Sequence, residues 1–153
     1  MRKYMKKLII IAGSPNSGKT LSVNMLIKKL IVQGATVDKR LFGSSPDFWD
    51  KDKGGAVIVL FNGKRIAIIS YGDIVSAVNE VFTNSEVLSC DIIICCSHAT
   101  RGKKVFNYFH DYIKTNKVLV TTEVIPIYKN LLCGFGDEML ENGRAADLIL
   151  SLI

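Results

Sequence analysis

The residues with the clearest chemical use lie between positions 13 and 20. They spell Gly-Ser-Pro-Asn-Ser-Gly-Lys-Thr, which fits the pattern G-x-x-x-x-G-K-[ST] at every fixed position. Glycines let successive backbone N–H groups turn inward as an anion-binding nest, and a helix that starts there adds its positive N-terminal end. The spacing therefore predicts an anion-binding site for phosphate groups at this loop.

The segments on either side of this motif have the periodicity that such a site needs. Residues 6–12 form a continuous apolar run, as expected for a strand covered on both faces. Residues 21–33 change to helical spacing, with Gly34 as a stop. A strand, a glycine-bearing loop and a helix in this order resemble the Walker A segment of the P-loop NTPase superfamily.

The resemblance implies that the chain binds ATP or GTP together with Mg²⁺. The residues expected to bind the nucleotide are those of the motif and the one that follows it: Gly13, Ser14, Pro15, Asn16, Ser17, Gly18, Lys19, Thr20 and Leu21. The alternative is a glycine-rich turn that only caps a helix, but such a turn has no need of the Gly-Lys-Thr end.

A P-loop enzyme also places an aspartate at the C-terminal end of a second strand, to position Mg²⁺ and water. Asp91 lies at the entry of its predicted strand, so we expect it at the opposite edge of the sheet from the phosphates. Asp73 follows the strand that ends at Ser70, and it is the predicted partner of Thr20 as a metal ligand. Asp73 also suits the N-cap of a helix starting at Ile74, and the two roles are compatible. Ser70 is a further candidate to hold a magnesium-bound water.

A basic segment follows the predicted strand 91–97, at the edge where parallel α/β sheets bind ligands. Arg101 is the predicted charge-stabilising catalytic residue, beside Lys19 and Asp73. The alternative for residues 101–104 is a solvated basic turn before a helix. His98 is interpreted as a loop histidine rather than a substrate contact.

The order of motif, helix, long polar loop and hairpin partly resembles the Ras-like small GTPases. Their hairpin leads into a D-x-x-G segment, but here Ser70 stands at the aspartate position and Asp73 at the glycine position. An N-K-x-D segment is also missing after the later strands. Guanine specificity is therefore not supported by the sequence.

The remaining elements predict one α/β domain over residues 1–153. The clearest is a hairpin at about 56–70, because Asn62-Gly63 suits a type I′ turn. Further strands are expected at 36–41, 91–97 and 118–122, where 124–128 either extends the last strand or turns away at Pro126; helices are expected at 74–82, at 105–113, and from about 138 or 144 to 152. The fold class is thus a three-layer, P-loop NTPase-like sandwich with a mostly parallel sheet of five or six strands and one antiparallel hairpin.

Composition limits the class of protein. Apolar residues make up 48% of the 153, which excludes intrinsic disorder. No apolar run approaches the roughly 20 residues needed to cross a bilayer. The basic start and the apolar run 8–12 imitate a signal peptide, but the run leads into the phosphate motif as a strand, and we expect a cytoplasmic protein.

The net charge of +6 is concentrated in the N-terminal third. Residues 1–53 hold 11 Lys and Arg against 4 Asp and Glu, which favours an anionic partner there. A nucleoside triphosphate satisfies this as well as nucleic acid does, and no base-reading element accompanies the basic residues. Four cysteines without a C-x-x-C pair, with two histidines, do not form a zinc pattern.

Three functions remain compatible with these residues. The first is an NTPase that hydrolyses the β–γ bond, in which residues 42–55 change conformation with the nucleotide. The second is a small-molecule or nucleotide kinase, in which residues 101–104 contact the phosphate acceptor. The third is a nucleotide-binding module with little or no hydrolysis that acts through a protein partner, and the missing aspartate at Ser70 favours it.

Overall fold

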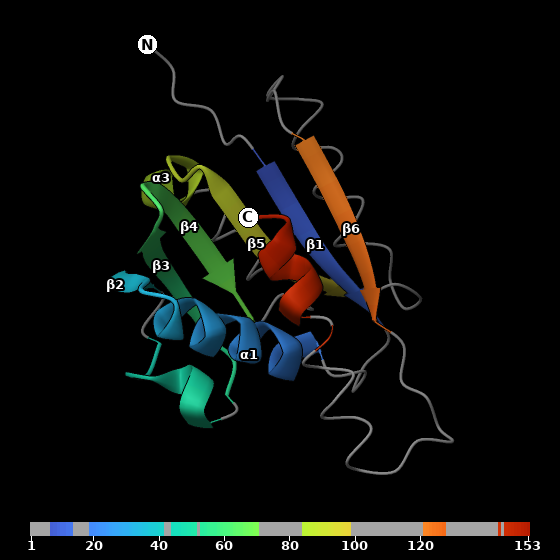
Figure 1. Cartoon of the computed structure of the whole chain (residues 1–153), viewed down its shortest axis with the longest axis horizontal. Coiled ribbons are helices and arrows are strands. Elements are labelled where there is room, and N and C mark those ends of the chain that lie inside the picture. The colour runs from blue at the N-terminus through green and yellow to red at the C-terminus, as the bar shows by residue number, and fades with distance from the viewer. Residues whose placement is uncertain are drawn as a thin grey trace.

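A computed structural model of the chain contains one six-stranded sheet in the order β2-β3-β4-β5-β1-β6 (Figure 1). The structure describes residues 7–13, 19–41, 44–51, 53–70, 84–98, 121–127, 144 and 146–153. The strands are β1 (Lys7–Gly13), β2 (Thr36–Leu41), β3 (Ala56–Phe61), β4 (Lys64–Ile69), β5 (Ile92–His98) and β6 (Thr121–Ile127).

Five of these strands run in the same direction. The pairings are parallel between β4 and β5, between β5 and β1, and between β1 and β6, whereas β3 pairs antiparallel to both β2 and β4. The arrowheads of β1, β4 and β6 accordingly point to the same side of the molecule in Figure 1. The α/β class and the mostly parallel sheet with one reversed hairpin strand are therefore as the sequence predicts.

The hairpin of β3 and β4 forms at the predicted turn. Asn62 and Gly63 have φ of 50° and 74°, the pair of positive angles that a type I′ turn requires. Its register pairs Phe61 with Lys64 and Ala56 with Ile69. β4 therefore ends directly before Ser70, and this turn decides where Ser70 lies.

Helix α1 (Lys19–Val32) begins with the last two residues of the motif and covers one face of the sheet. It starts two residues earlier than its apolar spacing predicts and ends before Gly34, whose φ of +104° stops it. Residues 146–151 form a second helix on the same face, in keeping with the predicted closing helix (Figure 1). The side chains that join these helices to the sheet are almost all buried: Ile9, Ile11, Val23, Leu26, Ile27, Leu30, Val57, Val59, Ile66, Ile68, Ile92, Ile94, Ala146 and Ile149.

Side chains on the opposite face of the sheet are buried as well, among them Leu8, Ile58 and Ile93. The helices predicted at 74–82 and 105–113 lie outside the described residues, as do residues 118–120. None of the described helices combines the length and the apolar character needed to cross a membrane.

The sequence left open whether the last strand extends past Pro126 or turns away there, and the structure shows the first. β6 continues through Pro126, which a sheet tolerates because β6 is an edge strand among the described strands and proline removes only one backbone donor. The short helix α3 (Ser85–Leu88) was not predicted. The sequence does contain a signal for this helix, because asparagine is a preferred N-cap residue. In the structure, the Asn84 side chain accepts hydrogen bonds from the backbone N–H groups of Glu86 and Val87.

Candidate functional site

Gly13, the first residue of the motif, ends β1 at the C-terminal edge of the parallel strands. Lys19 and Thr20, the last two residues of the motif, begin α1, the helix that covers one face of the sheet. Residues 14–18 and the Lys19 side chain lie outside the described parts of the chain. The predicted strand–loop–helix context is thus present on both sides of the motif.

Thr20 is joined to the end of a different strand. Its hydroxyl donates a hydrogen bond of 2.9 Å to the backbone carbonyl of Ser70, directly after β4. β5 lies between β4 and β1, so this contact spans two strand positions of the sheet. A threonine hydroxyl has one proton and two lone pairs, and donating the proton leaves the oxygen able to ligate a cation.

Ser70 itself is buried and has a structural role. Its Oγ accepts a 2.9 Å hydrogen bond from the Gly55 N–H, and its own N–H donates to the Gly55 carbonyl at 2.9 Å. The hydroxyl also lies 3.3 Å from that carbonyl, in position to donate to it. The contact between Ser70 and Thr20 therefore goes through the main chain, while the Ser70 side chain holds the start of β3.

Asn24 lies one helical turn after Thr20 on α1 and is fully buried. Its amide Nδ2 donates a 2.9 Å hydrogen bond to the carbonyl of Lys53. Among the described side chains, Asn24 Oδ1 is the buried polar atom without a hydrogen-bond partner. A buried polar atom without a hydrogen-bond partner costs free energy of folding.

Residues 44–55 form a packed structure rather than an extended loop. A short 3₁₀ helix, η1 (Phe48–Lys51), lies against α1 (Figure 1). Phe48 and Trp49 are buried, and their rings are in edge-to-face contact with centroids 5.1 Å apart. A Cβ added to Gly55 would lie 2.6 Å from the Phe48 ring, so only glycine fits there. These two aromatic side chains therefore anchor the segment to the core.

Other predicted site residues are placed only in part. His98 ends β5, and its Cα pairs with that of Gly13, which brings the two chain segments side by side at the motif. Leu21 is 40% exposed. Asp73 and Arg101 lie outside the described residues.

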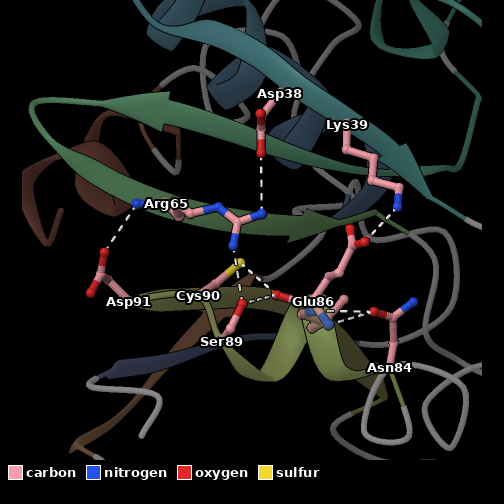
Figure 2. Close-up of polar contacts among 9 residues, drawn as sticks. Asp38, Lys39, Arg65, Asn84, Glu86, Ser89, Cys90 and Asp91 are labelled. Carbon is pink, nitrogen blue, oxygen red and sulfur yellow. Dashed lines mark hydrogen bonds and ion pairs between the residues drawn. The ribbon is translucent and has the colours of Figure 1, made fainter. Parts of the chain in front are cut away.

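Asp91 lies at the opposite, N-terminal edge of the sheet, as its position at a strand entry predicts. One of its carboxylate oxygens accepts a 3.1 Å hydrogen bond from the backbone N–H of Arg65. The Arg65 guanidinium bonds to Asp38 at 3.1 Å and to the Ser89 hydroxyl at 3.0 Å (Figure 2). This cluster joins β2, β4 and the turn before β5.

The cysteines of the described chain are buried thiols. Burial raises the pKa of Cys90 to about 11, although the nearby Arg65 opposes the shift. Burial also raises the pKa of Cys95 well above its usual value. A raised pKa favours the protonated, less reactive form of a thiol. Among the described residues, no group of three or more His, Cys, Asp and Glu side chains gathers to hold a metal ion.

Sequence reasoning missed Asn24, Ser44 and Gly55. Asn24 had a signal, because it is a polar residue four positions after Thr20 and lies among the apolar positions of a helix. The serine and the glycine had none, since the contacts that attach them to β3 and to the end of β4 join residues 12 and 15 positions apart. Ser44 Oγ accepts a 2.9 Å hydrogen bond from the backbone N–H of Ala56 and donates to Leu41.

Comparisons with known proteins add no assignment. No family model, no curated protein and no solved structure matches this chain. The function has to be argued from the site alone.

Proposed function

We propose that this chain binds a nucleoside triphosphate, ATP or GTP, together with Mg²⁺, through residues 13–21, and hydrolyses the β–γ phosphate bond. The observation that carries the proposal is the hydrogen bond from Thr20 to the carbonyl of Ser70. It holds the predicted metal-binding hydroxyl at the edge of the sheet where the motif begins. The proposed fold is accordingly a P-loop NTPase-like three-layer sandwich, and the proposed location is the cytoplasm.

Each residue has a defined role in this proposal. The backbone N–H groups of residues 14–19 surround the phosphates, and Lys19 neutralises their charge. Thr20 ligates Mg²⁺ through a lone pair of Oγ1, because its O–H group donates a hydrogen bond to the Ser70 carbonyl and leaves the lone pairs available. Asp73 completes the metal and water shell, and Arg101 stabilises the charge that develops on the transferred phosphoryl group. The metal supplies charge neutralisation and alignment of the phosphates.

Thermal unfolding with ATP, ADP, GTP and GDP, each with and without Mg²⁺, tests nucleotide binding. A ligand at about 100 times its Kd stabilises the folded state by roughly 2.7 kcal/mol, which shifts Tm by several degrees. We expect a magnesium-dependent shift that is lost in Lys19→Ala. Lys28→Ala is the matched control, because it removes a lysine from the same helix away from the motif. The absence of a shift with all four nucleotides would overturn the proposal.

Single-turnover assays with the preferred nucleotide then test hydrolysis. Phosphate release without an added acceptor supports the NTPase. Transfer only to an added acceptor replaces it with a kinase, and tight binding without turnover replaces it with a binding module that acts through a protein partner.

A further inference from the structure

Ser70 makes hydrogen bonds through three of its groups, and they lead to two different parts of the molecule. Its N–H and its hydroxyl hold the main chain of Gly55. Its carbonyl accepts the Thr20 hydroxyl. The residue is 1% exposed, so water does not compete for these contacts.

The segment 53–55 is held a second time, from α1. Asn24 donates to the carbonyl of Lys53 and, like Ser70, is buried. Thr20 and Asn24 are four residues apart and therefore lie on one side of the helix. The segment 53–55 is thus attached both to the helix that carries Thr20 and to Ser70, whose carbonyl accepts the hydrogen bond of the Thr20 hydroxyl.

We propose that Ser70 is the positioning residue for the Thr20 hydroxyl, and that the segment 53–55 sets the magnesium affinity of the nucleotide site through it. The inference rests on the proposed nucleotide binding and adds a regulatory connection to that site. A change at residues 53–55 then alters metal binding without any contact between these residues and the ligand.

The physical reason is the orientation of the Thr20 O–H group. A threonine hydroxyl rotates freely unless an acceptor fixes it, and the Ser70 carbonyl directs the proton away from the side on which a cation would bind. Loss of the hydrogen bonds between the Ser70 hydroxyl and Gly55 leaves only the backbone bond between the two residues, which loosens the end of β4 and with it the carbonyl. The Thr20 oxygen must then be ordered when the metal binds, and that cost appears as lower affinity.

The test compares Ser70→Ala with Ser44→Ala. Both variants remove a hydroxyl that accepts from a backbone N–H at the start of β3, from Gly55 in one case and from Ala56 in the other. Only Ser70 also contacts Thr20. Titration calorimetry with the preferred nucleotide measures its affinity for each protein in Mg²⁺ and in EDTA. The quantity compared is the ratio of the affinity in Mg²⁺ to the affinity in EDTA.

We expect this ratio to fall about three- to tenfold in Ser70→Ala, which is the value of one ordinary hydrogen bond. In Ser44→Ala the ratio equals that of the wild type. Affinity in EDTA is unchanged in both, because the phosphate contacts remain. Ser70→Thr retains the hydroxyl and restores the ratio.

A double-mutant cycle with Thr20→Val identifies the route of the effect. Once the Thr20 hydroxyl is gone, Ser70→Ala should have no further effect on the ratio. An unchanged ratio in Ser70→Ala, or an equal fall in Ser44→Ala, would overturn the positioning role while leaving nucleotide binding intact. If the wild type binds no nucleotide, both proposals fail, and that result is distinct. Ser70→Cys replaces Ser70→Ala if the alanine variant does not fold.

Discussion

The two edges of the sheet use polar groups in opposite ways. At the N-terminal edge, the charged groups bond to other parts of the protein. Arg65 bonds to Asp38, Ser89 and Asp91 (Figure 2). The ammonium groups of Lys7 and Lys64 donate to the carbonyls of residues 152 and 153 at 2.7 and 2.8 Å. These contacts attach β2, the turn before β5 and the last helix to the sheet.

At the C-terminal edge, two described side chains keep unused hydrogen-bonding capacity. The Thr20 hydroxyl donates a hydrogen bond and its oxygen retains lone pairs, and Asn24 leaves its buried Oδ1 without a partner among the described residues. The contrast teaches that polar side chains serve stability at one edge and can serve a ligand at the other. Substitutions at the two edges should therefore separate stability from nucleotide binding.

Gly55→Ala should have the largest effect on stability. The new Cβ would lie 2.6 Å from the fully buried Phe48 ring, which cannot shift without disturbing the packing against α1. We expect a loss of about 3 kcal/mol in the free energy of unfolding, measured by urea denaturation. Magnesium-dependent nucleotide affinity should fall as well. Gly54→Ala, at an exposed neighbouring position, is the control, and an equal loss there would contradict this account.

Cys90, at the N-terminal edge, should make the free energy of unfolding depend on pH. Its pKa is raised from 9.0 to about 11, so the folded state retains the thiol proton where the unfolded state has lost it. The free energy of unfolding should therefore decrease as pH rises from 9 to 11, by on the order of 2 kcal/mol. Cys90→Ala removes this titration. Parallel stability profiles for the variant and the wild type between pH 8 and 11 would count against it.

Arg65→Ala should cost about 1 kcal/mol, because it removes a hydrogen bond and an ion pair from a side chain that is 36% exposed. Arg65→Lys keeps the charge but not the two-pronged geometry, and we expect it to fall between the alanine variant and the wild type. Neither should alter nucleotide affinity. A changed ratio of affinities with and without Mg²⁺ in either variant would break the distinction between the two edges.

Lys39→Ala should have the smallest effect. Its ion pair with Glu86 is short, at 2.6 Å, but the two side chains are 51% and 43% exposed. Exposed pairs of this kind contribute about 0.3 kcal/mol and are screened by salt. Urea denaturation at low and high ionic strength measures both the contribution of the ion pair to the free energy of unfolding and its dependence on salt. A loss comparable to that of Arg65→Ala would show that this edge depends on the pair more than its exposure indicates.

Local chemistry made much of the fold predictable. Asn62-Gly63 fixes the hairpin because few other residue pairs adopt two positive φ angles, and Gly34 ends α1 for the same reason. Continuous apolar runs predicted β1 and β5 to within a residue or two, since both are central strands. Pro126 was ambiguous, because only the position of β6 at an edge makes a proline acceptable.

The candidate site was predictable only where its residues are consecutive. The motif at 13–20 is a local pattern, and its place between a strand and a helix follows from periodicity on either side. The contacts of Thr20 with Ser70, and of Asn24 with Lys53, join positions 50 and 29 residues apart. No local pattern encodes such pairs.

By itself, therefore, the sequence determined the elements and the motif, because turn geometry and apolar periodicity act over a few residues. Tertiary structure decided the strand order, with β5 between β4 and β1, and decided that the backbone carbonyl of Ser70 accepts the hydrogen bond of the Thr20 hydroxyl. It also decided that residues 44–55 pack on α1 through Phe48 and Trp49. The reason is physical: burial and hydrogen bonding between distant segments depend on which faces meet, and that is settled only when the whole chain folds.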